Sequence, residues 1–297
     1  MGRLLMYSEG LSVQNASIDD YRYCMYVQRR YGKSYYFATR FFPPQLRHHV
    51  YALYAFVRIA DQWVDDPSEQ DGEKIARLLE DYEHDLKLAL AGRKVSNPVL
   101  RAFAQTAKQF TIPESYMLDF LDAMRQDLFC SRYPTYQHLQ RYMWGSAGVV
   151  GAMMLCLFGC HRHELIPYAV HMGEAMQMTN FLRDVGEDWK RGRIYLPQED
   201  LERFGVTEED IASANISEKV KQLLQYEIQR TRSLYAEAEK GISLLPCEYQ
   251  YPVKLASRLY ARVLYHIEVN GYDVFRQRAQ TSIFEKIYIA WHCRKEI

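Results

Sequence analysis

Two acidic segments, each with a pair of aspartates four residues apart, constrain this chain more than any other feature. They read Asp61-Gln-Trp-Val-Asp65 and Asp184-Val-Gly-Glu-Asp188. Four residues make about one turn of an α-helix, so the two carboxylates of each pair share a face and repel each other. A divalent cation bound by carboxylate oxygens, with a phosphate completing its coordination, would relieve that repulsion. The spacing therefore predicts two helices that present acids to a ligand.

The environment of each pair matters more than its spacing. Asp81 and Asp85 have the same spacing, but they lie among many other charged residues, as is typical of a solvated helix face. Asp61 instead follows the almost wholly apolar segment 50–60, which predicts a buried helix. A buried carboxylate is costly unless it is paired or metal-bound. Arg58 could pair with Asp61 or bind a diphosphate through two hydrogen bonds, and we favour the second interpretation.

The second pair ends a polar stripe along the predicted helix 167–189. Its members follow at steps of three, four and four: Gln177, Asn180, Asp184 and Asp188. Two amides and two acids make a poor core face but suit Mg²⁺ and phosphate oxygens. Arg183 and the basic segment 190–193 lie beside the stripe, and we interpret Lys190 and Arg191 as solvated cations at a helix C-terminus.

Helical signals dominate the whole chain, and no run of alternating strand pattern interrupts them. Caps, prolines and glycines predict helices over 17–31, 44–66, 69–91, 98 onward, 113–130, 135–160, 167–189, 217–244, 251–278 and 282–294, with a loop of short turns at 194–207. The 48% hydrophobic content suits a full-sized core, and no Gly-, Ser- or Pro-rich linker divides the chain. We expect one all-α domain over residues 1–297.

The bulk charge and hydropathy exclude some functions. Lysine plus arginine equal aspartate plus glutamate at 37 each, which argues against nucleic-acid binding. The longest apolar run, 147–160, is shorter than the roughly 18 residues of a membrane span. We expect a cytoplasmic protein with reduced cysteines, and peripheral membrane contact stays open.

Small and sulfur-containing residues recur in the middle of the chain. Gly145, Gly148 and Gly151 surround Ala147 at steps of three, where a helix or a ligand could approach closely. Methionines follow at 153, 154, 172, 176 and 178, and taken alone they are better interpreted as core than as a channel wall.

Two longer strings resemble the squalene/phytoene synthase family, the head-to-head prenyl synthases. They are Tyr51-Ala-Leu-Tyr-Ala-Phe-Val-Arg-Ile-Ala-Asp-Gln-Trp-Val-Asp65 and Asn180-Phe-Leu-Arg-Asp-Val-Gly-Glu-Asp188, continuing to Gly192-Arg-Ile-Tyr-Leu-Pro197. The resemblance extends from about Tyr21 to Ile283 and implies an isoprenoid-synthase fold with a central cavity. Many members carry a second aspartate where this chain has Gln62, some carry a serine in place of Gly32, and a tyrosine is common in place of Trp144.

The resemblance also implies roles for individual residues. Metal ions that bridge to diphosphate would be held by Asp61, Asp65, Asn180, Asp184 and Asp188. Substrate would contact Lys33, Ser34, Tyr54, Arg58, Gln177, Asn180 and Arg183. Aromatic positions near the reacting carbons are Tyr142 and Tyr260. The hydrophobic tunnel would be lined by Ala147, Val150, Gly151 and Gly173.

The function implied is a Mg²⁺-dependent prenyl transfer, with Mn²⁺ as a substitute. One allylic diphosphate ionises, a second attacks it, and a cyclopropyl intermediate rearranges.

Asn270-Gly-Tyr-Asp-Val-Phe-Arg-Gln-Arg-Ala279 resembles the corresponding segment of the phytoene-forming members. These members join two geranylgeranyl diphosphates and finish by proton loss without NADPH. The alternatives are condensation of two farnesyl diphosphates to presqualene diphosphate, dehydrosqualene or squalene, and a non-catalytic scaffold of the same fold. The sequence does not indicate the oligomeric state.

Overall fold

Local capping signals set where the helices begin. In the computed structural model, which describes residues 15–65 and 71–296, Ser17 and Asp20 cap the first helix reciprocally, with N–H···O distances of 2.8 and 3.2 Å. Asn97 caps another helix and Pro98 occupies its first turn, where a missing N–H costs nothing. The predicted helix starts at 17–18 and 97–98 are therefore confirmed.

Fourteen α-helices lie in the described residues, and these residues contain no β-strand beyond one isolated bridge between Arg132 and Ile194. A π-helical turn, Trp144–Gly148, joins α7 to α8. The helices are α1 Ile18–Tyr31, α2 Lys33–Thr39, α3 Pro44–Asp65, α4 Gly72–Leu90, α5 Pro98–Gln109, α6 Glu114–Gln126, α7 Tyr136–Met143, α8 Val149–Leu157, α9 Ile166–Lys190, α10 Gln198–Arg203, α11 Glu208–Ala212, α12 Glu218–Lys240, α13 Cys247–Val269 and α14 Ile283–Cys293.

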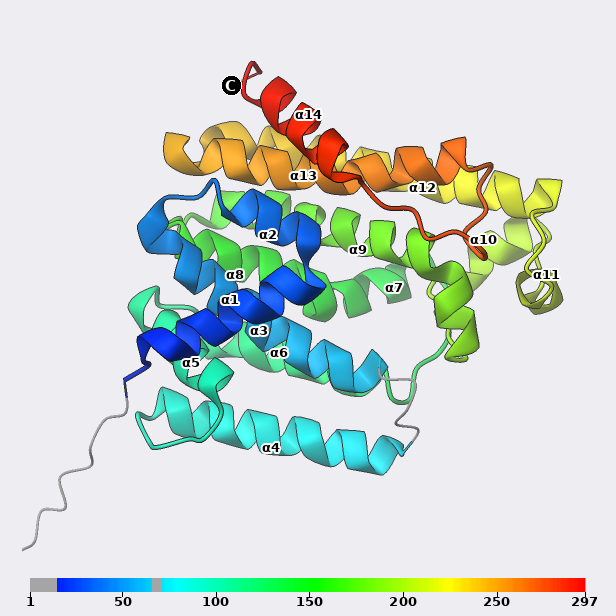
Figure 1. Cartoon of the computed structure of the whole chain (residues 1–297). Helices are drawn as coiled ribbons and strands as arrows, with labels where there is room; N and C mark the ends of the chain where they lie inside the picture. The colour runs from blue at the N-terminus through cyan, green and yellow to red at the C-terminus, as the bar shows by residue number, and fades with distance from the viewer. Residues whose placement is uncertain (1–14, 66–70, 297) are drawn as a thin grey trace, which may run out of the picture.

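The long helices stack in layers around α9, which lies at the centre of the molecule (Figure 1). α12 and α13 cover α9 on one side, and α14 lies outermost on α13. α8 and the π-turn pack on α9, while α3 packs between α1 and α5. The expected all-α fold is confirmed, and no described helix is both long and apolar enough to cross a bilayer.

Some predicted boundaries are wrong. The helix expected over 251–278 ends at Val269, because Gly271 and Tyr272 adopt positive φ angles of 67° and 65°. The segment after it consists of turns and irregular chain, and it brings Arg278 to Asp184 of α9. The helix expected to reach Cys130 ends at Gln126, and the expected loop 194–207 contains the short helix α10. The start of the helix predicted from Glu69 lies outside the described residues.

Glycine allows α9 to approach the π-turn and α8 very closely. A β-carbon on Gly173 would lie 2.3 Å from the backbone oxygen of Ala147, and one on Gly151 would lie 2.2 Å from that of Ala169. Two glycines at one crossing let the helix backbones touch directly, and this contact sets the position of α9 relative to α8.

Gly173→Ala should lower the free energy of unfolding by about 1–3 kcal/mol, since the added methyl group has no space without moving a backbone. Denaturant unfolding followed by circular dichroism measures this change. Gly72→Ala is the matched control, because a β-carbon there meets nothing within 4 Å. Equal stability of the two variants would show that the crossing can relax.

Candidate active site

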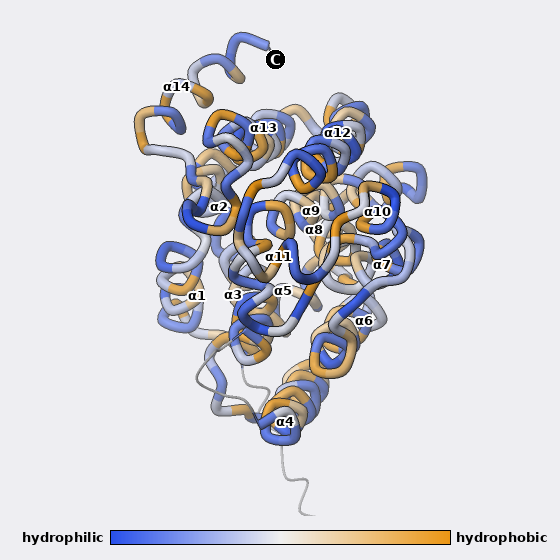
Figure 2. Tube along the Cα trace, turned by 90° about the vertical axis from the view of Figure 1, so that its right-hand side faces the viewer, coloured by the Kyte–Doolittle hydropathy of each residue, from blue (hydrophilic) through white to orange (hydrophobic). Residues whose placement is uncertain are grey.

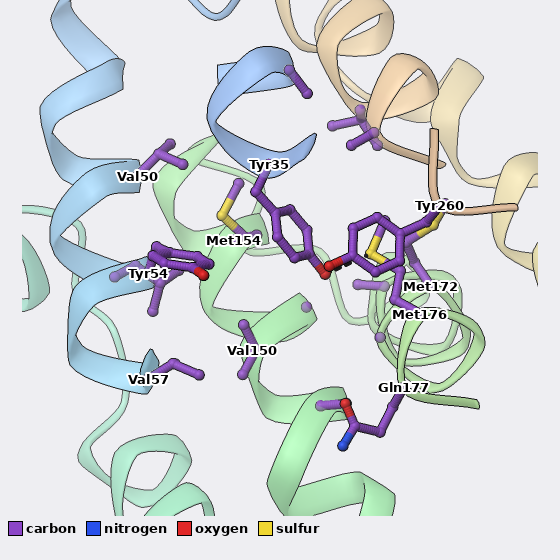
Figure 3. A pocket seen from close by; sticks show the side chains of 18 of the residues that line it. Tyr35, Val50, Tyr54, Val57, Val150, Met154, Met172, Met176, Gln177 and Tyr260 are labelled. Atoms are coloured by element: carbon purple, nitrogen blue, oxygen red, sulfur yellow. Dashed lines mark hydrogen bonds between the residues drawn. The ribbon is translucent and has the colours of Figure 1, made fainter. Parts of the chain in front are cut away.

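An apolar cavity of about 450 Å³ lies between α3, α8 and α9, closed by residues of α2, α12 and α13. It follows α9 from Tyr168 to Arg183, roughly 22 Å at 1.5 Å per residue. Figure 3 shows Val50, Tyr54 and Val57 of α3 facing Val150 and Met154 of α8 across it. Of the residues predicted to line a tunnel, all four lie on its wall: Ala147, Val150, Gly151 and Gly173.

Two tyrosines point toward each other in the cavity, Tyr35 from α2 and Tyr260 from α13 (Figure 3). Their ring centroids are 4.6 Å apart, and the Tyr35 hydroxyl donates to the sulfur of Met176 at 3.1 Å. Tyr260 was predicted near the reacting carbons, whereas Tyr35 was not singled out. Met154, Met172 and Met176 also line the cavity, so the interpretation of the methionines as simple core is incomplete.

A polar pocket adjoins one end of the cavity, and all four predicted aspartates line it. α3 supplies Asp61 and Asp65, and α9 supplies Asp184 and Asp188. Six residues line both the cavity and the pocket and so form their junction: Arg58, Asp61, Gln177, Asn180, Arg183 and Arg278. The charged pocket and the apolar cavity therefore adjoin each other along these residues.

Arginines hold the aspartates of the polar pocket. Arg58 donates to Asp61 at 2.5 Å, and Arg193 donates to Asp65 at 3.1 Å. Asp184 accepts two hydrogen bonds each from Arg183 and Arg278, at 2.5–2.9 Å.

Arg191 lies 3.4 Å from Asp188 and 3.8 Å from Asp65. The interpretation of Arg191 as only a solvated cation is therefore wrong. Arg193 and Arg278 were not predicted as site residues, although both lie in strings that carry the family resemblance.

The acids remain electrostatically unbalanced in spite of these arginines. Burial raises the pKa of Asp188 to about 8, and the nearby Asp184 and Asp65 add to the shift. Burial and the neighbouring Asp65 likewise raise the pKa of Asp61 to about 6. Burial acts in the same direction on Asp184, but the hydrogen bonds from Arg183 and Arg278 outweigh it and lower its pKa. The pocket thus favours additional positive charge near Asp61 and Asp188.

The oxygen atoms that line the pocket suit a hard divalent cation as ligands. Carboxylate and amide oxygens are the ligands such ions prefer, and the Asn180 Oδ1 atom is buried without a hydrogen-bond partner. In the described residues no three acidic, histidine or cysteine side chains converge on one point, because each aspartate is turned toward an arginine. A bound cation would compete with these arginines for the same oxygens.

Two predicted substrate residues lie elsewhere. Lys33 lines a separate surface hollow, and the Ser34 hydroxyl lies 3.5 Å from that of Thr281. Neither is among the described residues that line the cavity or the polar pocket. Both belong to the first turn of α2, the helix that brings Tyr35 into the cavity.

Behind the acids lies Asp127, a buried carboxylate that sequence reasoning missed. It accepts hydrogen bonds from the hydroxyls of Tyr142 at 2.6 Å and Tyr195 at 3.1 Å. Burial raises the pKa of Asp127 to about 7, against the opposing effects of Arg193 and both hydroxyls. Asp127 thereby fixes Tyr142, a predicted aromatic site residue, at the wall of the polar pocket. No motif marked Asp127, which follows an ordinary amphipathic helix.

The fold and the site together define a class: an all-α protein with an apolar cavity that ends in a pocket of facing aspartates and arginines. The family model for squalene/phytoene synthase matches residues 28–285. The chain belongs to the squalene/phytoene synthase family.

Two relatives in this family match over most of their lengths. The chain is 35% identical to the phytoene synthase of Arthrospira platensis over 91% of this chain and 90% of that protein. It is 35% identical to the 15-cis-phytoene synthase of Synechocystis sp. over 93% and 86% of the two chains.

Solved structures agree with this placement. A dehydrosqualene synthase in complex with ligand superimposes with a TM-score of 0.87 at 29% identity, covering 94% of this chain and 96% of that one. The squalene synthase HpnC from Alicyclobacillus acidocaldarius has a TM-score of 0.77 at 30% identity, with 86% and 95% of the chains covered.

The raised pKa of Asp127 should make the protein less stable as pH rises. Between the ordinary value of 3.8 and about 7, the folded state keeps a proton that the unfolded chain has lost, so the free energy of unfolding falls across this window. Asp127→Asn cannot ionise and should lack this contribution. Urea unfolding of both proteins across the window measures the difference. Parallel stability profiles would contradict the assignment.

Proposed function

We propose that this protein joins two molecules of geranylgeranyl diphosphate head to head, giving phytoene and releasing diphosphate. The observation that carries the proposal is that the polar pocket adjoins the apolar cavity and shares six residues with it, since a prenyl diphosphate has a charged head and a long apolar tail. The names of the similar phytoene synthases support the same substrate, and the length of the cavity along α9 suits an extended C20 tail.

The residues of the junction bind the head of the substrate. The guanidinium groups of Arg58, Arg183 and Arg278 can donate paired hydrogen bonds to diphosphate oxygens once they leave Asp61 and Asp184. Arg58 already has one buried nitrogen, Nε, without a hydrogen-bond partner. When the arginines exchange these aspartates for the diphosphate, the leaving group gains hydrogen-bond donors that already lie in the site.

We assign Mg²⁺ to the aspartates, with Asp61, Asp65, Asn180, Asp184 and Asp188 as its protein ligands. The bound ion would supply Lewis-acid stabilisation of the leaving diphosphate. Its positive charge also suits a pocket in which Asp61 and Asp188 resist ionisation. Mn²⁺ has similar ligand preferences and is the expected substitute.

The cavity wall controls the fate of the allylic cation that remains when the carbon–oxygen bond breaks. Valine and methionine side chains exclude water that would otherwise trap it. The ring faces of Tyr35, Tyr54 and Tyr260 can stabilise positive charge through their π-electrons. Tyr142 lies on the polar side, held by Asp127, next to the departing diphosphate.

Condensation of two farnesyl diphosphates is the second candidate, because dehydrosqualene and squalene synthases have the same fold at 29–30% identity. Ending in phytoene requires loss of a proton and no reductant, whereas squalene requires a reductive step. A non-catalytic scaffold would not need the aspartates and arginines that line the polar pocket.

Product analysis distinguishes these candidates. Purified protein incubated with Mg²⁺ and geranylgeranyl diphosphate should form phytoene without NADPH, and it should turn over farnesyl diphosphate more slowly. Chromatography with mass spectrometry identifies the lipids. Formation of C30 products only would establish the second candidate, and no product from either substrate would refute synthase activity.

Asp61→Asn and Asp184→Asn should each lower kcat by at least about a hundredfold, because each replaces a charged ligand of the proposed Mg²⁺ by a neutral amide. Chelation of divalent ions should abolish turnover of the unmodified protein, and added Mg²⁺ should restore it. Asp81→Asn is the matched control, since this aspartate is exposed on α4. Unchanged turnover of a folded Asp61→Asn protein would show that Asp61 does not take part in catalysis.

A further inference from the structure

The outermost helix, α14, turns its large apolar side chains away from the protein. Phe284, Tyr288 and Trp291 have 81%, 62% and 56% of their surface exposed, and Ile283 and Ile287 are each 56% exposed. These five residues recur at helical spacing and form one stripe, the apolar face of α14. The inward positions of the helix are Lys286, Ala290 and Cys293. A helix folded only for core packing would show the opposite arrangement.

The helix is held in place, so the apolar face of α14 is a stable surface. Ser282 and Glu285 form a capping box at its start. Glu285 also pairs with Arg262 at 3.1 Å and with His266 at 2.9 Å, both on α13. The Tyr251 hydroxyl donates to the Ala290 carbonyl oxygen at 2.8 Å.

A basic, aromatic surface lies on the same side of the molecule. Residues 21–60 contain no aspartate or glutamate. The exposed residues of α1, α2 and the turn that follows them include five basic and four aromatic side chains: Arg22, Arg29, Arg30, Lys33, Arg40, Tyr23, Tyr26, Tyr31 and Phe41. Within the described ranges, no ion pair involves Arg29, Arg30, Lys33 or Arg40.

The two surfaces adjoin. α14, α2 and α1 lie toward the viewer in Figure 1 and along the left-hand edge in Figure 2. Ser34 of α2 approaches Thr281 just before α14, and Lys33 is close enough to Lys286 to lower its pKa, an effect that adds to that of burial. Because the whole chain has zero net charge, this concentration of positive charge is local.

We propose that α14, together with the exposed surface of α1 and α2, docks this protein on an anionic lipid bilayer. Tryptophan, tyrosine and phenylalanine suit the boundary between acyl chains and headgroups, and neighbouring lysines and arginines attract anionic lipids. A second copy of the chain fits less well, since a two-fold dimer through this surface would bring its own basic residues together.

The docking surface is one helix layer away from the cavity. α14 packs through Ala290 and Cys293 on a cluster that also contains Ala38 and Ala256, and both of these alanines line the cavity. A bilayer bound to α14 would therefore lie beside the small-residue wall formed by α2 and α13. Passage of an insoluble hydrocarbon product from the cavity to the membrane rests on the proposed function. The docking of the protein on the bilayer does not depend on that function.

Flotation of the full chain with lipid vesicles tests the proposal. The protein should float with vesicles of phosphatidylcholine mixed with phosphatidylglycerol, and less with phosphatidylcholine alone or at high salt. The double variant Phe284→Ser, Trp291→Ser should bind at least about tenfold more weakly, because two aromatic anchors are lost. Arg29→Gln with Arg30→Gln should weaken binding to the anionic vesicles only.

Phe129→Ser is the matched control, since this phenylalanine is 83% exposed in the loop after α6 and should leave binding unchanged. Circular dichroism and turnover with detergent-dispersed substrate verify that each variant is folded.

No flotation of the unmodified protein, or equal flotation of the double variant, would overturn the proposal. Sedimentation showing a dimer that the double variant dissociates would assign the surface to a second copy instead. Flotation by a protein without synthase activity would refute the proposed function and leave the docking intact.

Discussion

The arrangement of this protein depends on balancing the charge of four aspartates gathered at one end of an apolar cavity. Asp184 and Asp188 are largely buried, whereas the side chains of Asp61 and Asp65 are about one-third exposed. Uncompensated burial of a carboxylate is costly, and an arginine beside each acid offsets part of that cost. These arginines come from α3, α9 and the segments that follow α9 and α13. The same groups that stabilise the acids in the absence of ligand are suited to bind the phosphates of a substrate, which joins the stability of the site to its proposed chemistry.

One wall of the cavity beside these charges is formed where glycine permits two backbones to approach closely. The contact of Gly173 with Ala147 and of Gly151 with Ala169 draws α9 against the π-turn and α8. On the opposite side of the cavity, the larger side chains of α3 line the space between α3 and α9 without filling it. The π-turn itself was not predictable from the sequence, since it depends on how α7 and α8 are held by their neighbours.

Much of the site was predictable because helical spacing orders side chains along one face. Gln177, Asn180, Asp184 and Asp188 needed only the assumption of a helix to be placed together. Asp127 and Arg278 were missed because neither belongs to such a stripe, and each reaches the pocket from a segment that ends or follows a helix. Lys33 and Ser34 were expected near substrate, yet the turn of α2 directs Tyr35 into the cavity and leaves those two outside it.

The sequence by itself determined where most of the helices begin, several of their caps, the two acidic stripes and the family, since these depend on residues close together in the chain. Tertiary structure alone decided which arginine meets which aspartate, how far the cavity extends, and which face of α14 stays exposed. Those outcomes depend on distant segments: Arg278 pairs with Asp184 only because Gly271 ends α13 and turns the chain back toward α9. Local spacing carries no information about such pairings, because they follow from how whole helices pack.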